Sequence, residues 1–201
     1  MPDHADQIVA HYERHASHWD ADRRNGIWND SIWHNRFVTL LHQGATVLDL
    51  GCGGGIPVSH HLAAHGLRVT GVDTSPSLIA LCRERLAAQE WLTADMRSLG
   101  LARTFDGILA WDSYFHLSPD DQRAMFGVFA AHARPGTILM FNTGPAYGIA
   151  LGAYRGEVLY HASLDASEYR ERLARQQFEL IDHTIEDPRA GGRTVWLARR
   201  A

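Results

Sequence analysis

The sequence predicts an α/β fold in which helices cover both faces of a mostly parallel, seven-stranded sheet and the chain closes on an antiparallel hairpin. Two observations predict this arrangement. Short apolar segments alternate with segments of helical periodicity, which is typical of βαβ units. The first apolar segment ends abruptly in a glycine-rich turn at residues 51–55, and a turn of this kind between a strand and a helix is typical of ligand-binding sheets.

Length and composition indicate one domain, residues 1–201, of which 45% are hydrophobic and 21% are charged. The formal net charge of −4 argues against a nucleic-acid partner or a basic membrane-binding face. No apolar run approaches the roughly 18 residues of a membrane span, and residues 1–4 lack the layout of a signal peptide. We therefore expect a soluble, cytoplasmic protein whose two cysteines, Cys52 and Cys82, are small buried side chains.

The first 43 residues are expected to form a helical cap. Ile8, Tyr12 and Trp19 recur near one face of a helix over residues 5–22. Ser31 is placed to cap a second helix that ends near residue 41.

The centre of the chain alternates strands with helices. Strands are expected at residues 46–50, 68–72, 91–93 and 105–111, and helices at residues 57–65 and 76–88. This alternation predicts that the strands run parallel.

The C-terminal part begins with a helix that Ser118 caps, with Pro119 at its first position, and that should end near residue 134, before Pro135 and Gly136. A strand at residues 137–142 follows. Residues 143–164 are too long for a simple connection and are expected to form a lid loop. Residues 165–168, Asp-Ala-Ser-Glu, open the last helix as a capping box. Strands at residues 178–186 and 193–198 then form the closing hairpin.

The glycine-rich turn carries the most informative motif. Residues 49–55 read Asp-Leu-Gly-Cys-Gly-Gly-Gly, whereas a dinucleotide fingerprint would need a glycine where Ile56 stands. Counted from Asp49, the string is acid-x-Gly-x-Gly-x-Gly, and here the sequence resembles the class I S-adenosylmethionine-dependent methyltransferases over nearly its whole length. The resemblance implies a Rossmann-like, doubly wound fold and S-adenosylmethionine as cofactor, with Asp49, Gly51 and Gly53 among the cofactor-binding residues.

Two acids follow the next two strands. The resemblance implies that Asp73, with Thr74 beside it, accepts hydrogen bonds from the ribose hydroxyls, and Asp73 lies at the spacing from the glycines that such an acid needs. A helix-capping role for Asp73 is the alternative. In similar enzymes the acid at the position of Asp95 accepts the adenine amino group while the backbone amide of Met96 meets the ring. A surface acid is the alternative for Asp95.

The resemblance also points to residues at the junction of cofactor and acceptor. Trp111 and His116 leave the fourth strand at the carboxyl edge of the sheet, where open α/β sheets bind ligands. His116 is the first candidate for a catalytic base, and a structural histidine is the alternative. Tyr12 and Trp19 resemble the aromatic residues with which the family's N-terminal segment covers the cofactor, and aromatic faces suit a sulfonium cation. Ordinary packing is the alternative for both.

Asp112, Tyr114 and His161 are weaker candidates for the base.

Several other site types are not supported. The chain lacks the Asn-Pro-Pro-aromatic and Pro-Cys strings of enzymes that methylate bases, and Ser113 lacks a nucleophile elbow. Asp112 and Asn142 end two neighbouring strands, but one carboxylate makes a poor divalent-cation site.

A histidine stripe on the first helix contains a pair with metal-binding spacing, but no third ligand is evident, so no metal is expected. The stripe comprises His4, His11, His15 and His18.

The resemblance implies transfer of a methyl group from S-adenosylmethionine by in-line displacement, and the acidic charge balance and the short chain favour a small-molecule acceptor. Two other functions remain open. A non-catalytic sensor could use the same cofactor motifs. A nicotinamide or nucleotide-sugar enzyme could share the first half of the chain, but it would ordinarily continue with a parallel sixth strand instead of the closing hairpin.

Overall fold

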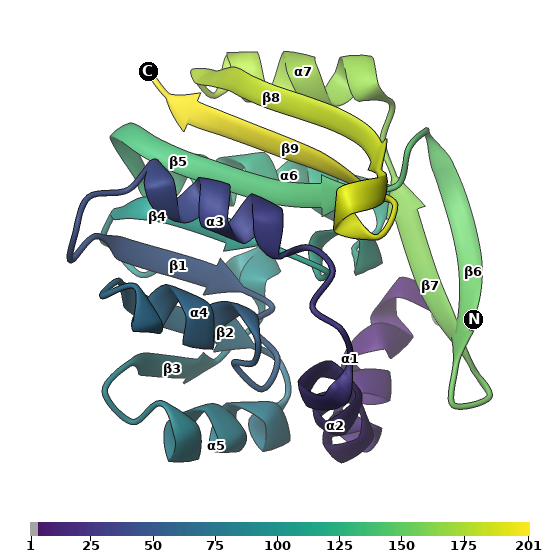
Figure 1. Cartoon of the computed structure of the whole chain (residues 1–201). Helices are drawn as coiled ribbons and strands as arrows, with labels where there is room; N and C mark the ends of the chain where they lie inside the picture. Colours follow the sequence, from purple (N-terminus) through teal and green to yellow (C-terminus); the bar gives the residue numbers. More distant parts are fainter. Residues whose placement is uncertain (1–3) are drawn as a thin grey trace.

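A seven-stranded sheet forms the centre of the computed structural model, which describes residues 4–201 without the side chains of His4 and Asp6 (Figure 1). The strand order is β3-β2-β1-β4-β5-β9-β8. All neighbouring pairs are parallel except those of β9, which is antiparallel to both β5 and β8. The strands are β1 (Thr46–Leu50), β2 (Arg68–Asp73), β3 (Glu90–Thr93), β4 (Phe105–Ala110), β5 (Ala133–Thr143), β8 (Phe178–Asp187) and β9 (Arg193–Arg200). The α/β fold with a closing antiparallel hairpin is confirmed.

Helices cover both faces of the sheet. On one face α3 (Ser31–Thr39), α4 (Val58–Ala64) and α5 (Pro76–Arg85) pack through Phe37, Leu62 and Ile79 against the buried side of the strands. On the other face α6 (Pro119–Ala131) and α7 (Ala166–Arg175) pack through Phe129 and Tyr169. Figure 1 shows α3 and α4 in front of the sheet and α6 behind it. The doubly wound arrangement follows from these two apolar layers.

The N-terminal segment differs from its prediction. The helix expected over residues 5–22 is two helices, α1 (His4–Arg14) and α2 (Ala16–Asn25), which meet at the non-helical His15. The break lets α1 contact β7 while α2 contacts α5. The next helix has Asp30, and not Ser31, at its N-cap position, and it ends at Thr39.

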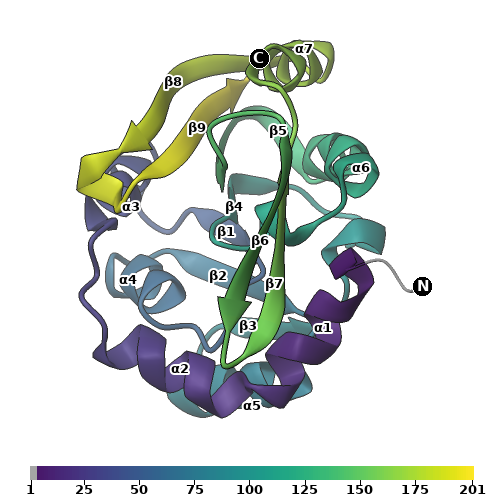
Figure 2. The ribbon, with the colours of Figure 1, turned by 90° about the vertical axis from the view of Figure 1, so that its right-hand side faces the viewer.

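Residues 143–164 do not form a loop, so that prediction is wrong. They form a two-stranded antiparallel sheet of β6 (Gly148–Tyr154) and β7 (Glu157–Ser163). Arg155 and Gly156 between them both have positive φ, at 54° and 81°, which is the backbone of a tight two-residue hairpin. Figure 2 shows this hairpin lying across the carboxyl edge of the sheet with α1 beside β7.

Two smaller predictions also need correction. The helix expected to end near residue 134 ends at Ala131, because β5 already begins at Ala133 and contains Pro135 and Gly136 at an irregularity in its pairing with β4. Cys82 is buried, but Cys52 is only partly buried, and both are free thiols.

None of the helices between residues 4 and 201 is both long and apolar enough to cross a membrane.

Ser118→Ala should lower the free energy of unfolding by about 1 kcal/mol, because the Ser118 hydroxyl accepts a hydrogen bond from the Asp121 amide at the start of α6. Urea denaturation followed by circular dichroism measures the change. Ser118→Thr, which keeps a hydroxyl at the same position, is the control. An equal loss in both variants would show that the hydroxyl does not stabilise the helix.

Candidate functional site

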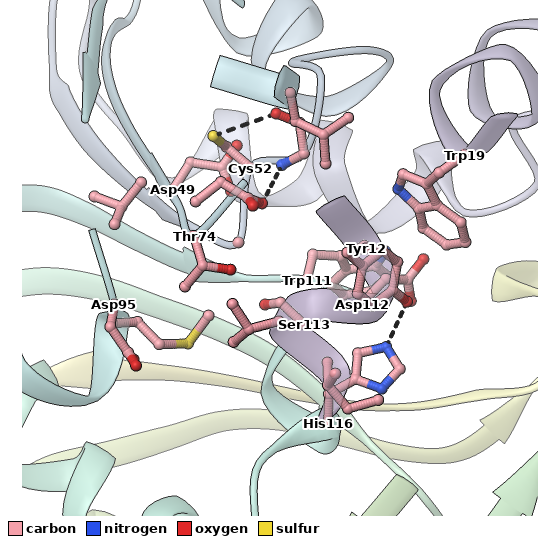
Figure 3. A pocket seen from close by; sticks show the side chains of 18 of the residues that line it. Tyr12, Trp19, Asp49, Cys52, Thr74, Asp95, Trp111, Asp112, Ser113 and His116 are labelled. Carbon is pink, nitrogen blue, oxygen red and sulfur yellow. Dashed lines mark hydrogen bonds between the residues drawn. The ribbon is translucent and has the colours of Figure 1, made fainter. Parts of the chain in front are cut away.

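A cavity opens at the carboxyl ends of the central strands, beneath α1 and α2, and holds about 1150 Å³ including the open space at its mouth (Figure 3). The structure brings together around it all the residues predicted to bind the cofactor and the first candidate for the base. They are Tyr12, Trp19, Asp49, Gly51, Gly53, Asp73, Thr74, Asp95, Met96, Trp111 and His116.

Only glycine fits at position 51 in the turn after β1. Its φ of +78° lies in the left-handed region, and a Cβ added there would stand 2.2 Å from the Cβ of Ser113. The amides of Gly51 and Cys52 both donate to the carbonyl of Val72, at 2.7 and 3.1 Å. These bonds tie the turn to the end of β2, so the backbone itself forms this wall of the cavity.

Two acids flank the glycine turn, and Asp49 is buried whereas Asp73 is partly buried. Asp73 ends β2, and its carboxylate accepts hydrogen bonds from the amides of Gly53 and Ser75, each at 2.9 Å. Burial raises the pKa of Asp73. Asp49 accepts a hydrogen bond from the Ser59 hydroxyl, and burial raises the pKa of Asp49 to about 6. The N-cap of α5 is Ser75, whose hydroxyl accepts from the Leu78 amide at 3.1 Å, so the cavity acid Asp73 is not the cap.

Asp95 lies at the far end of the same cavity with its charge already paired. Its carboxylate accepts hydrogen bonds from the Arg97 guanidinium at 2.7 to 3.1 Å and from the Arg97 amide at 2.9 Å. Burial opposes ionisation, but the Arg97 hydrogen bonds outweigh it and lower the pKa of Asp95. Arg97 also reaches Asp121 on α6 at 3.3 Å. The ion pair between Arg97 and Asp121 was not predicted.

Tyr12 and His116 form a hydrogen-bonded pair at the cavity wall, marked by a dashed line in Figure 3. His116 Nδ1 lies 2.8 Å from the carbonyl oxygen of Tyr160, which can only accept, so Nδ1 carries the proton. Nε2 therefore presents its lone pair, and the Tyr12 hydroxyl donates to it at 2.7 Å. Burial lowers the pKa of His116 to about 4, so the imidazole is neutral at pH 7.

A second cavity meets the first one beside this pair. It is bordered by the hairpin, including Ile149, Leu159 and His161, by the segment after β5, and by Phe115 from the segment after β4. Five residues line both cavities: Tyr12, Trp19, Arg23, Asp112 and His116. The rings of Tyr12 and Trp19 pack edge to face with centroids 5.1 Å apart. The two cavities thus share a wall of aromatic and charged side chains.

Asp112 is engaged by cations and an amide. Its carboxylate accepts two hydrogen bonds of 2.7 Å from Arg193 and one of 2.9 Å from Asn142, and Arg23 lies 3.5 Å away. Burial raises the pKa of Asp112, but the Arg193 hydrogen bonds outweigh burial, so the pKa is lowered overall. Two guanidinium groups around one carboxylate disfavour both a bound divalent cation and a proton transfer to Asp112.

The two other base candidates, Tyr114 and His161, differ in whether they border a cavity. Tyr114 is fully buried in the core, donates to the carbonyl of Gln122 at 2.9 Å and lines neither cavity, so its prediction as a base is wrong. The His161 ring lies 4.9 Å from that of His116 and borders the second cavity. Ser113 donates to the carbonyl of Leu50 at 2.7 Å, which is a structural bond.

Sequence reasoning missed several side chains that shape the site. Arg23 lies four residues after Trp19 on α2, and that spacing alone could have placed it on the same helix face. Asp20 pairs with Arg85 of α5 at 2.5 and 2.8 Å and fastens α2 over the glycine turn. Glu13 accepts from the Ser77 hydroxyl at 2.6 Å and fastens α1. These contacts join residues more than sixty positions apart.

The histidine stripe is also only partly as expected. His11 and His15 meet Glu157 of β7, a third possible ligand that is distant in the sequence and was not predicted. The ring of His18 lies 6.4 Å from that of His15. The side chain of His4 lies outside the described residues.

Residues 47–136 match the family described as methyltransferase domain. A ubiquinone biosynthesis O-methyltransferase of Coxiella burnetii is 40% identical over 112 residues, which cover 53% of this chain and 45% of that protein. A cypemycin N-terminal methyltransferase of Streptomyces is 36% identical over 127 residues, which cover 61% of this chain and 51% of that protein. The chain spans about half the length of the curated relatives it matches.

Solved structures share the fold across nearly the whole chain. A magnesium protoporphyrin IX methyltransferase of Synechocystis aligns with a TM-score of 0.73 at 21% identity, covering 100% of this chain and 99% of that one. An amino pentose methyltransferase of Micromonospora echinaspora, solved with S-adenosylmethionine bound, aligns with a TM-score of 0.71 at 20% identity, covering 92% and 96%.

Proposed function

We propose that this chain is a class I S-adenosylmethionine-dependent methyltransferase that transfers a methyl group from S-adenosylmethionine to a small-molecule acceptor. The observation that carries the proposal is the meeting of two cavities at the carboxyl edge of the sheet. The glycine turn and Asp73 border one cavity, and the hairpin borders the other. A cofactor in the first and an acceptor in the second would face each other across Tyr12 and His116.

The first cavity has the features that the cofactor requires. Each carboxylate oxygen of Asp73 accepts one backbone amide and has a second lone pair for a ribose hydroxyl. Asp95 and the backbone at Met96 would meet the adenine, and the aromatic rings of Tyr12 and Trp19 suit the sulfonium. We assign cofactor contacts to Tyr12, Trp19, Asp49, Gly51, Gly53, Asp73, Thr74, Asp95, Met96 and Trp111.

The bound cofactor supplies a methyl group that its sulfonium already activates, so the chain mainly has to align the acceptor and exclude water. Helices α1 and α2 and the hairpin cover the reacting region. Tyr12 can take the acceptor's proton on its oxygen while it passes its own proton to His116 Nε2. His116 is therefore the proposed base and Tyr12 the residue through which it reaches the acceptor.

The second cavity supports a small-molecule acceptor. Apolar and aromatic side chains such as Phe115, Ile149 and Leu159 border it, and Arg23 and Asp112 add charge at its inner end, which is the usual composition of small-molecule sites. The net charge of −4 gives no support to a nucleic-acid substrate. A cytoplasmic location is part of the proposal.

Calorimetry should show saturable binding of S-adenosylmethionine and of its demethylated product in the low micromolar range or tighter, because the glycine turn and the two acids lie around one cavity. A nicotinamide dinucleotide is the comparison ligand. The assignment would be overturned if the dinucleotide bound and neither S-adenosylmethionine nor its demethylated product did. Mass detection of methylated products in a metabolite pool then separates an enzyme from a sensor, because a sensor binds the cofactor and forms no product.

A further inference from the structure

Two histidines and one glutamate meet where α1 packs against β7. His11 belongs to α1, His15 joins α1 to α2, and Glu157 begins β7. His11 Nδ1 lies 3.2 Å from one carboxylate oxygen of Glu157, and His15 Nε2 lies 3.0 Å from the other. The three possible ligand atoms all lie within 4.8 Å of one another. The group therefore gathers around one point in space.

The spacing of these atoms fits a small transition-metal ion. Nitrogen and oxygen ligands about 2.0 to 2.1 Å from a tetrahedral zinc ion stand about 3.3 Å apart. The two nitrogen-to-oxygen distances of 3.0 and 3.2 Å are close to that value. Two imidazoles and one carboxylate are a donor set that zinc uses, whereas magnesium and calcium prefer oxygen ligands.

The surroundings hold the ligands in place. His11 is 2% exposed, and its Nε2 is buried without a hydrogen-bond partner among residues 4–201, so Nδ1 is the nitrogen presented to Glu157. The Tyr154 ring packs edge-on against both histidines, with centroids 5.8 and 5.9 Å away. Arg14 donates a hydrogen bond to the same Glu157 carboxylate. Arg14 is also the competitor for that carboxylate.

We propose that His11, His15 and Glu157 bind a divalent transition-metal ion of the zinc type, which fastens the β6–β7 hairpin to α1. The hairpin and α1 border the two cavities, so this metal would hold two of their walls together. The proposal does not depend on methyl transfer, because it concerns ligands that lie outside the first cavity and is tested by binding alone.

Calorimetric titration of the metal-free full chain with zinc chloride should show saturable binding of one ion per chain, and magnesium chloride should show none. His15→Gln and Glu157→Gln should each weaken zinc binding by about 100-fold or more, since even outer-shell partners of a metal contribute about 10- to 100-fold. Circular dichroism verifies that both variants fold. Absence of saturable zinc binding by the natural sequence would show that the cluster is an ion-pair network only.

Two further variants distinguish zinc binding at the proposed site from zinc binding by other histidines. His61 and His65 form another pair four residues apart, with ring centroids 4.2 Å apart, so His65→Gln should leave zinc binding unchanged. Arg14→Gln removes the competing cation and should tighten zinc binding several-fold. Loss of binding in His65→Gln, or no loss in Glu157→Gln, would overturn the assignment.

Hydrogen exchange tests the fastening itself. Zinc should slow amide exchange in β7 of the natural sequence and have no such effect in Glu157→Gln. Zinc binding with unchanged exchange in β7 would contradict the proposed link between the hairpin and α1.

Discussion

His116→Ala is expected to lower turnover by about 100-fold at neutral pH while changing the affinity for S-adenosylmethionine little. The imidazole accepts a hydrogen bond from the Tyr12 hydroxyl at Nε2 and donates one from Nδ1 to the hairpin carbonyl of Tyr160. Its loss removes the group that can receive a proton through Tyr12. Steady-state kinetics with an acceptor found in the metabolite screen, together with calorimetry of cofactor binding, measure the two effects separately.

Tyr12→Phe is the matched variant, because it keeps the ring packing with Trp19 and removes only the hydroxyl. If the proton passes through Tyr12 to His116, then Tyr12→Phe, His116→Ala and the double variant should lose similar amounts of turnover. The effects of substituting residues that act as a unit do not add. If His116→Ala instead lowers the melting temperature and leaves turnover intact, His116 is a structural histidine.

The pH profile gives a second check on the same histidine. Burial lowers the pKa of His116 to about 4, so the neutral, proton-accepting form is present above that pH. A rate that requires neutral His116 should persist as the pH falls below 7 and disappear only as the pH falls through about 4. A loss of rate near pH 6.5, the ordinary pKa of histidine, would contradict the proposed base.

Asp73→Ala should weaken cofactor binding by about 1.5 to 3 kcal/mol, because two ribose hydroxyls would lose a charged acceptor. That loss corresponds to about 10- to 150-fold in the dissociation constant. Calorimetry with S-adenosylmethionine and with its demethylated product measures it.

Ser75→Ala is the control for the effect of Asp73 on folding. It removes the side chain that caps α5 and leaves the Asp73 carboxylate in the cavity wall. We expect this variant to lose stability, by about 1 kcal/mol, and to keep its cofactor affinity. If Asp73→Ala unfolds more easily but binds the cofactor as tightly as the natural sequence, the Asp73 carboxylate stabilises the glycine turn and does not contact the cofactor.

The central strands and the glycine turn could be predicted because their signals are local. The strand expected at residues 46–50 is β1 with the same bounds. It is short and apolar, and it ends at glycines, so no distant contact is needed to recognise it. Helix ends were less predictable, because the end of α6 depends on where β5 begins to pair with β4.

The hairpin was missed because its turn and its outer face give weak signals. Arg155 adopts a positive φ of 54°, which is uncommon for a residue other than glycine, asparagine or aspartate. Gly148 and Gly152 favour a loop. Ile149 and Leu151 are 63% and 57% exposed, so the apolar residues of β6 do not mark a buried face.

The candidate site was predictable where residues follow strands, and not where distant segments meet. Asp73 ends β2 and Asp95 follows β3, so the sheet topology alone brings them to one edge. The pairing of Arg193 with Asp112 and the meeting of Glu157 with His15 join segments that are 81 and 142 residues apart. Such contacts depend on the final packing, and no local pattern encodes them.

The hydrogen bond from His116 to the main-chain carbonyl of Tyr160 makes the proposed proton transfer independent of the side chains that would select the acceptor. A main-chain oxygen is the same in every residue type, so the tautomer of the base is set by the path of β7 and not by which side chains β7 carries. Substitutions at hairpin positions that face the second cavity, such as Ile149 and Leu159, can then reshape the space for the acceptor without changing which nitrogen receives the proton. A hairpin of this kind lets one proton-transfer apparatus serve differently shaped acceptors.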